Sequence, residues 1–310
     1  MLRYLLKRLG WMLLTLWLIV TLTFILMHSI PGDPFSQDGK KYPEPILKNL
    51  RAKYHLDEPL PVQYVLYLKN LLMLDMGPSI KSDTRTVNDV IADGFPVSFQ
   101  LGLAAVVLAL VVGILLGVLA ALRHGSWLDN AATAVAVLGI SVPSFVMAPL
   151  LQKYFGLKWK FLPVAQWGTF EHMILPAVAL SLGPLAVIAR FTRSSMLDVL
   201  GQDYIRTAKA KGLSQPATVF RHALRNALMP VITYLGPLLA AILTGTFVIE
   251  KIFAIPGLGK YFVESIVNRD YPMIMGTTIF YSAILVVMML LVDLAYTLVD
   301  PRIKLASEED

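Results

Sequence analysis

Residues 94–122 read GFPVSFQLGLAAVVLALVVGILLGVLAAL and contain no charged side chain. A helix of about 20 apolar residues is long enough to cross the hydrocarbon core of a bilayer, which is about 30 Å thick. Lipid offers the backbone no hydrogen-bond partner, so an apolar run of this length is expected to be helical throughout. The run therefore predicts a transmembrane helix and indicates an all-α membrane protein.

Further charge-free runs of similar length occupy residues 9–32, 130–152, 172–189, 226–249 and 271–292. The composition agrees with this pattern, because 56% of the residues are hydrophobic and 15% are charged, whereas soluble domains have about 25% charged residues. We therefore predict six transmembrane helices, of which the run at 172–189 is the shortest.

The Lys and Arg residues indicate how these helices are oriented. If the N-terminus is cytoplasmic, the short inner segments carry more Lys and Arg than the two short outer loops, as the positive-inside rule requires. We therefore expect a multi-pass protein of the plasma membrane with both termini in the cytoplasm. The net charge of +6 is explained in this way and does not indicate a nucleic-acid partner.

The predicted orientation divides the chain into four parts. Residues 1–32 form the cytoplasmic N-terminus and the first transmembrane helix, and residues 33–93 form an extracytoplasmic segment. Residues 94–300 form a core of five transmembrane helices, and residues 301–310 form a cytoplasmic tail.

The extracytoplasmic segment is predicted to contain two short amphipathic helices. Apolar residues recur at helical spacing in Leu60–Leu74, and a second helical segment covers Pro43–Tyr54. One face of this small helical cap needs burial, so we expect it to pack on the outer ends of the membrane helices. Reception of an external partner is the alternative.

A basic segment that faces water, Asp203–Gly212, reads DYIRTAKAKG. An acid at its start and lysines near its end complement the macrodipole of a helix, and Gly212 can adopt the left-handed conformation that closes a helix. Ala208 and Ala210 are expected to keep the surface low enough for a partner to approach. From the residues alone, a solvated connector and a docking site for a soluble partner are equally well supported.

Two apolar runs contain residues that could interrupt a membrane helix or face a polar path. Gly139–Phe145 contains a proline between two serines, which predicts a kink that serves as a hinge, as part of a path, or only for packing. Small and hydroxyl residues near Gly245 allow close helix contact or could face a polar lumen. The candidate path residues are Ser141, Pro143, Ser144, Thr244 and Thr246.

The sequence lacks the motifs that would indicate catalysis or nucleotide binding in this chain. It has no phosphate-binding loop, no HExxH zinc motif, no G-x-S-x-G nucleophile motif and no cysteine. The five histidines are scattered, so their spacing suggests no metal site. Asp293 is the conspicuous acid within the runs, near the cytoplasmic interface, where we expect a structural partner. We expect no enzyme activity and no cofactor or metal in this chain.

Taken together, the motifs in their order resemble those of the B-type permease subunits of oligopeptide or dipeptide ATP-binding-cassette importers. The resemblance covers essentially the whole chain. It rests on the motifs Ile30–Pro34, Gly94–Phe99, Gly139–Phe145, Asp203–Gly212, Arg221–Ala227 with Pro230, Gly245–Glu250, Ile255–Gly259, Arg269–Tyr271 and Asp300–Arg302.

The resemblance implies a type I importer permease fold in which residues of about 198–212 form the coupling helix that sits in a groove of an ATPase subunit. The family signature E-A-A-x-x-x-G, aligned on Gly212, places Arg206 where the signature has its acid, so the resemblance implies no salt bridge from an acid at this position. The residues implied in coupling are Asp203, Tyr204, Arg206, Thr207, Ala208, Lys209, Ala210, Lys211 and Gly212.

The resemblance also implies partners and an outer gate. The expected partners are a homologous C-type permease subunit, two ATP-binding subunits that hold ATP and Mg, an extracytoplasmic peptide-binding protein and membrane lipid. The location would be the inner membrane of a bacterium. The outer loop that could dip into the mouth of the path comprises Ile255, Pro256, Gly257, Leu258 and Gly259.

The function implied is ATP-driven import of oligopeptides or dipeptides by alternating access. Relatives of this permease class also carry nickel or other small solutes, which remains an alternative. An autonomous channel or ion-coupled carrier would instead favour ionisable residues near the middle of the spans and, for many carriers, duplicated halves. Neither pattern is evident in the sequence. A membrane scaffold without transport is the third possibility.

Overall fold

A computed structural model describes residues 2–29, 35, 43–82 and 84–299. Within these residues the chain forms helices joined by turns, with one isolated bridge between Pro78 and Thr86. The predicted all-α class is confirmed. The motifs Ile30–Pro34 and Asp300–Arg302 and the predicted tail 301–310 lie outside the described residues.

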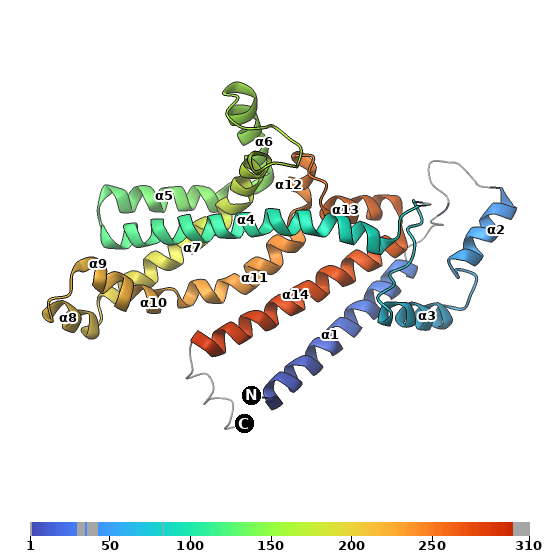
Figure 1. Ribbon diagram of the computed structural model, residues 1–310, viewed down its shortest axis with the longest axis horizontal. Helices are drawn as coiled ribbons and strands as arrows, with labels where there is room; N and C mark the ends of the chain where they lie inside the picture. The colour runs from blue at the N-terminus through green and yellow to red at the C-terminus, as the bar shows by residue number, and fades with distance from the viewer. Residues whose placement is uncertain (1, 30–34, 36–42, 83, 300–310) are drawn as a thin grey trace. The chain divides into compact units, whose positions relative to one another are not determined.

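The helices are labelled in chain order in Figure 1. They are α1 (Leu2–Ser29), α2 (Glu44–Lys53), α3 (Leu60–Leu72), α4 (Val87–Leu122), α5 (Trp127–Ser141), α6 (Ser144–Leu151), the π-helix η1 (Gln152–Lys158), α7 (Phe170–Leu200), α8 (Asp203–Ala210), α9 (Gln215–Thr218), the π-helix η2 (Val219–Ala223), α10 (Leu224–Ala227), α11 (Met229–Gly245), α12 (Phe247–Ile252), α13 (Leu258–Asn268) and α14 (Tyr271–Val299).

Four described helices are long and apolar enough to cross a membrane by length and composition. They are Leu6–Ser29 within α1, all of α4, all of α7, and Tyr271–Leu291 within α14. A bent pair made of α5 and the helix Ser144–Lys158 would give a fifth span, and α11 contains only the shorter apolar helix Met229–Leu239. The predicted count of six spans is therefore not confirmed.

The predicted third span contains a full break between two helices. α5 ends at Ser141, α6 begins at Ser144, and the two helices of this bent pair differ in direction by 105°. A proline disfavours helical geometry in the residue before it, and Val142 is extended, with φ −97° and ψ 113°. Pro143 therefore explains both the predicted interruption and its position.

The two helices predicted in the extracytoplasmic segment are confirmed as α2 and α3. Each begins with a proline in its first turn, where the missing N–H has no helical partner to lose. The Tyr64 hydroxyl of α3 lies 2.6 Å from Thr21 Oγ1 of α1, and Gln63 Oε1 lies 3.1 Å from His28 Nε2. The predicted packing of this segment on a membrane helix is therefore confirmed for α1.

The chain divides into two compact units, each formed from two parts of the sequence. The first contains Met1–Val97 and Gly257–Val286, and the second contains Ser98–Pro256 and Val287–Asp310. In the first unit, buried Asp270 accepts hydrogen bonds from the Ser79 hydroxyl and from the Ile80 N–H, the latter at 3.1 Å. This joins the segment between α3 and α4 to the start of α14.

The second unit is organised around α7, on which α5, α6, α10 and α11 pack. Glycines bring neighbouring helices very close to it. A Cβ at Gly117 of α4 would lie 2.6 Å from the Ala189 carbonyl oxygen, and a Cβ at Gly139 of α5 would lie 2.9 Å from the Leu182 carbonyl oxygen. A hydrophobic core of the second unit contains Val106, Ala109, Leu185, Ile188, Val231, Leu238 and Ile242.

Candidate functional site

The helix α8 lies within the predicted docking segment and begins at its acid, Asp203. The implied coupling helix of about 198–212 is longer than α8, because residues 198–200 belong to the end of α7. Ile205 is fully buried and Ala208 is 6% exposed. Residues three positions apart lie on the same face of a helix, so this pair holds α8 onto its own chain. Ala208 was expected to keep the outer surface low, and that expectation is wrong because its side chain faces inward. Of the two alanines, only Ala210 is exposed.

The end of α8 is closed by two backbone hydrogen bonds around a left-handed glycine. Gly212 has φ +82°, the Gly212 N–H donates to the Lys209 carbonyl at 3.0 Å, and the Leu213 N–H donates to the Ala208 carbonyl at 3.3 Å. This pair of bonds is the Schellman motif. The predicted left-handed conformation of Gly212 is confirmed. No atom lies within 4 Å of a Cβ placed there.

The outer face of α8 is polar and exposed. Arg206 Nη1 lies 3.4 Å from Asp203 Oδ1, and the two side chains are 76% and 96% exposed. Such exposed pairs contribute little to stability, so both groups remain available to a partner. The Tyr204 hydroxyl accepts a hydrogen bond from Asn226 Nδ2 at 2.9 Å, which fixes α8 against α10. The exposed members of the predicted set are Asp203, Tyr204, Arg206, Thr207, Lys209, Ala210, Lys211 and Gly212.

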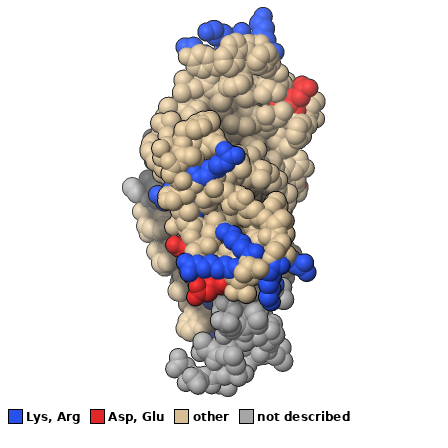
Figure 2. Space-filling model, turned by 90° about the vertical axis from the view of Figure 1, so that its left-hand side faces the viewer, with Lys and Arg blue, Asp and Glu red and all other residues tan. Residues whose placement is uncertain are grey.

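The inner face of α8 rests on a core contributed by several helices. The buried residues of this cluster are Ala121, Met196, Ile205, Val219, Ala223 and Ala227. They come from the end of α4, the end of α7, α8 itself, η2 and α10. Figure 2 shows Lys and Arg side chains on the face that includes α8 and α9. A partner that displaces α8 therefore acts on α4, α7 and the start of the α9–α11 segment together.

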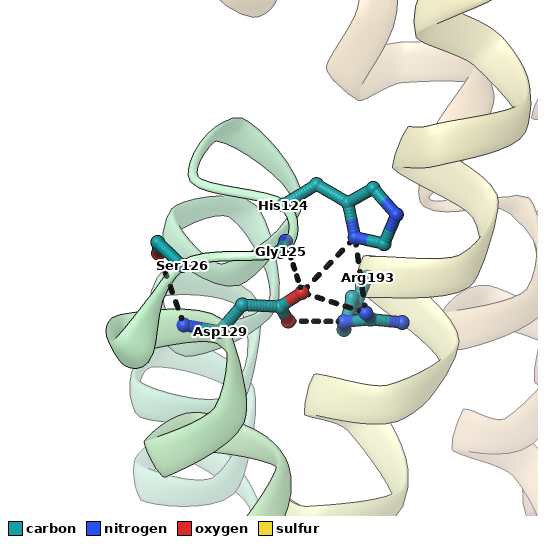
Figure 3. A network of polar contacts seen from close by, with 5 residues as sticks. All are labelled: His124, Gly125, Ser126, Asp129 and Arg193. Atoms are coloured by element: carbon teal, nitrogen blue, oxygen red, sulfur yellow. Dashed lines mark hydrogen bonds and ion pairs between the residues drawn. The ribbon is translucent and has the colours of Figure 1, made fainter.

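A second polar site, which was not predicted from the sequence, joins the start of α5 to α7. Arg193 Nε donates to Asp129 Oδ1 at 2.5 Å, and Arg193 Nη2 donates to Asp129 Oδ2 at 2.8 Å (Figure 3). The Asp129 side chain is 3% exposed and that of Arg193 is 29% exposed. The Gly125 N–H donates to Asp129 Oδ2 at 3.0 Å. The orientation of the carboxylate is therefore fixed by Arg193 of α7 and by the backbone of the turn before α5.

His124 completes this network on its exposed side. Its Nδ1 lies 3.0 Å from Asp129 Oδ2 and 3.3 Å from Arg193 Nη2 (Figure 3). A protonated Nδ1 can donate to the carboxylate, and an unprotonated Nδ1 can accept from the guanidinium, but one nitrogen cannot do both in one tautomer. The His124 side chain is 62% exposed, so it is secondary to the Asp129–Arg193 pair.

The part of this network at the start of α5 could have been recognised from a helix-start pattern in the sequence. Ser126 and Asp129 have the spacing of a helix N-cap followed by an acid before an apolar run. Ser126 is the N-cap of α5, and its side chain accepts from the Asp129 N–H. The signal predicts a helix start at this position, but it does not indicate Arg193 as the partner.

A third polar site contains the buried carboxyl of Glu250 in α12. Glu250 is fully buried, and its Oε1 accepts hydrogen bonds from Ser98 Oγ and Thr246 Oγ1, both at 2.6 Å. Thr246 was expected to face a polar path, but it is 1% exposed and donates to Glu250. In this conformation Ser98 and Glu250 link α4 to α12, and Thr246, the N-cap of α12, is buried beside them and does not face an open lumen.

The other predicted path residues lie at the break between α5 and α6. Ser141 and Pro143 are exposed, and Ser144 is half-buried. The Ser141 hydroxyl donates to the Val137 carbonyl at 2.8 Å, within its own helix. The side chains of Thr244 and Asp293 lie outside the described part of the chain. A path formed by the predicted set as a whole stays a prediction.

The predicted outer gate loop is largely packed against its own chain. Ile255, Gly257, Leu258 and Gly259 are buried, and Pro256 is exposed. The Ile255 N–H donates to the Glu250 carbonyl at 2.8 Å. In the first unit, a Cβ at Gly94 would lie 2.9 Å from the Leu258 backbone nitrogen. If this loop moves as a gate, these contacts must break, and its role as an outer gate stays a prediction.

No cluster of three or more His, Asp or Glu side chains that could hold a metal ion occurs among the described residues. The polar sites just described connect helices to one another or form the exposed face of α8. Their arrangement is suited to positioning and to transmitting movement.

Comparisons with known proteins cover both parts of the sequence. Residues 113–305, more than half of the chain, match the family described as "Binding-protein-dependent transport system inner membrane component". Residues 1–102 match the family described as "Binding-prot-dependent transport system membrane comp, N-term".

Similar proteins match over nearly their whole length. The chain is 60% identical over 305 residues to the dipeptide transport system permease protein DppB of Bacillus subtilis, with 98% of this chain and 99% of that protein covered. It is 45% identical over 306 residues to the oligopeptide transport system permease protein OppB of Haemophilus influenzae, with 98% and 100% covered.

A solved structure has a similar fold. A chain of the MetNI methionine ABC transporter, in an inward-facing conformation, matches with a TM-score of 0.55 and 18% identity, and the match covers 68% of this chain and 96% of that chain. At this identity the likeness concerns the fold alone. It supports the fold class predicted from the sequence.

Proposed function

This chain belongs to the family of inner-membrane components of binding-protein-dependent transport systems, and from this membership we propose that it is the permease subunit of an ATP-driven importer of dipeptides or oligopeptides. The observation that carries the substrate class is the near full-length similarity to a dipeptide permease at 60% identity and to an oligopeptide permease at 45% identity. Membership of this family also gives the chain a multi-pass location in the inner membrane.

The proposed importer contains further subunits. The chain pairs with a homologous C-type permease subunit, two subunits bind and hydrolyse ATP with Mg, and an extracytoplasmic binding protein delivers the peptide. Both termini and α8 lie on the cytoplasmic side. The absence of a phosphate-binding loop from the sequence supports the assignment of ATP hydrolysis to the partners.

The proposed contact with an ATP-binding subunit is made by the exposed face of α8. Three observations support this assignment: the helix is short and closed at its C-terminal end, its outer face is polar and exposed, and its inner face rests on α4, α7 and α10. When the ATP-binding subunits close, α8 moves with them and displaces the helices on which it rests. The transport path then alternates between outward-open and inward-open forms.

Reconstitution of the purified complex tests the proposed function. The tagged chain is expected to co-purify with a second permease subunit and two ATP-binding subunits. In vesicles, with the binding protein present, the complex is expected to take up a labelled dipeptide or tetrapeptide only with ATP. Uptake of nickel without uptake of peptide would contradict the substrate class. Substrate-selective flux through the chain alone would contradict ATP-driven import and favour an autonomous carrier.

A further inference from the structure

The pair formed by Asp129 and Arg193 connects two helices that are far apart in the sequence. Its two hydrogen bonds, at 2.5 and 2.8 Å, join both carboxylate oxygens to the planar guanidinium. A bidentate pair of this kind fixes direction as well as distance. The Gly125 N–H donates to the same carboxylate, and the Ser126 side chain caps α5 at the Asp129 N–H. The position of α5 is therefore tied to that of α7.

The same two helices are joined again near the other end of α5. Gly139 lies against α7 so closely that an added Cβ would be 2.9 Å from the Leu182 carbonyl oxygen and 3.1 Å from the Ala186 Cβ. At about 1.5 Å per residue, the two joints are separated by roughly 15 Å along each helix. Two joints at this separation prevent α5 from rotating or sliding independently of α7.

The arrangement places the pair between α8 and the break in the predicted third span. On one side, α7 ends at Leu200, only seven residues after Arg193, and α8 begins at Asp203. The end of α7 also contributes Met196 to the core on which α8 rests. On the other side, α5 ends at Ser141, directly before the break.

Burial gives a reason to assign this pair a role in positioning. The desolvation of a buried ion pair offsets much of its attraction, so such pairs add little stability relative to apolar contacts. The Asp129 side chain is 3% exposed and lies in a helix whose side chains are otherwise mostly exposed or half-buried. Stability alone therefore does not account for a buried, bidentate pair at this position.

We propose that Asp129 and Arg193 form an ionic clamp that makes α5 and α7 move as one body, so that a displacement of α8 reaches the break at Val142–Pro143. This inference rests on the proposed function, because it requires a partner that moves α8. Both residues are positioning residues: they carry movement between helices and do not contact the transported solute. His124 stabilises the clamp from its exposed side.

The clamp is tested in the full complex with Asp129→Asn and with Arg193→Lys. Asparagine keeps the size of the side chain and removes its charge. Lysine keeps the positive charge and removes the planar fork that makes the pair bidentate. The peptide imported per ATP hydrolysed is expected to fall roughly fivefold or more, the range of typical coupling effects between sites. Hydrolysis of ATP itself is expected to continue. Glu264→Gln, which breaks the exposed Lys260–Glu264 pair, is the matched control and should not change the ratio.

A second measurement follows the movement of α5 without any transported solute. The natural chain has no cysteine, so Leu138→Cys, at an exposed position of α5, reports on this helix through its rate of maleimide labelling. With the clamp intact, ATP is expected to change the labelling rate. With Asp129→Asn, the ATP-dependent change should shrink roughly fivefold or more. This readout keeps the clamp testable even if the solute is not a peptide.

Covalent relinking separates a clamp from a merely stabilising contact. In the double variant Asp129→Cys and Arg193→Cys, a short bifunctional maleimide reconnects α5 and α7 without restoring any charge. Relinking is expected to recover most of the import per ATP. The clamp is overturned if the unlinked variants couple normally, or if the linked double variant stays as uncoupled as the unlinked one. A complex with Leu138→Cys that imports no peptide, but whose ATP-dependent labelling change shrinks when Asp129→Asn is added, would contradict the substrate class alone and support the clamp.

Discussion

Two Arg–Asp pairs in the second unit differ in almost every respect except chemistry. Arg206 and Asp203 are three residues apart on α8, 3.4 Å from one another, with side chains that are 76% and 96% exposed. Arg193 and Asp129 are 64 residues apart, bonded twice, and the Asp129 side chain is 3% exposed. The first pair leaves its charges available at a surface, whereas the second fixes two helices to one another. The comparison shows that burial and sequence separation, and not residue type, decide which role an ion pair has.

The largest effect on stability is expected from breaking the buried pair. Arg193→Ala removes the charge partner of a buried carboxylate, and removal of one member of a buried ion pair costs about 3–5 kcal/mol. The contacts from Gly125 and His124 remain, so we expect a loss of about 3 kcal/mol. Denaturant or thermal unfolding of the detergent-purified protein measures it. Unfolding that matches the wild type would show that the buried pair behaves like the exposed one.

The next effect is expected at the other joint between α5 and α7. In Gly139→Ala, the new Cβ would lie 2.9 Å from the Leu182 carbonyl oxygen, a backbone atom that cannot move away alone. Overpacking of this kind costs about 1–3 kcal/mol. The matched control is Gly183→Ala at the same crossing, where the nearest atom is 3.9 Å away. A thermal shift that is equal for both alanines would argue against close packing at this joint.

A smaller loss is expected where α8 ends. Gly212 has φ +82°, and no neighbouring atom lies within 4 Å of an added Cβ. The cost of Gly212→Ala is therefore conformational, about 1 kcal/mol. Asparagine tolerates the left-handed region better, so Gly212→Asn should lose less. Import per ATP in vesicles should follow the same order as the unfolding measurements, glycine above asparagine above alanine. The reverse order for the last two would contradict the conformational explanation.

The smallest effect on stability, with a clear effect on assembly, is expected for the exposed charges of α8. Lys209→Glu with Lys211→Glu changes side chains on the outer surface, where ion pairs add little to folding. We expect an unchanged unfolding temperature and a reduced amount of co-purified ATP-binding subunit. Lys260→Glu, exposed in the other unit, is the control for a general charge effect. Normal assembly of the double variant would contradict the proposed docking face.

The sequence alone was sufficient to predict the structural features that depend on local or periodic patterns of residues. The long spans α4 and α7, the helices α2 and α3, the start of α8 at Asp203 and the left-handed Gly212 all follow from apolar runs, prolines and helix-end signals. Each of these signals acts within a few residues, so a single sequence contains them.

The remaining features depend on contacts between distant segments. Ala208 faces inward because α4, α7 and α10 form a core below α8. The sequence of α8 does not show this core, so the sequence alone predicts a surface position for Ala208. Thr246 is buried because it donates to Glu250, whose carboxyl also binds Ser98. The partner of Asp129 lies 64 residues away. No periodicity connects positions at that distance, so the clamp was not visible in the sequence.

The break at Val142–Pro143 has a consequence for the lipid around the protein. α5 contains 15 residues, which at about 1.5 Å per residue gives a length of about 22 Å. The hydrocarbon core of a bilayer is about 30 Å thick, and the chain turns by 105° before that distance is covered. A thicker bilayer would enlarge this mismatch, at a cost of a fraction of a kcal/mol per Å. Membrane thickness is therefore expected to affect the break at Val142–Pro143, the segment that moves with α5 and α7 in the proposed clamp.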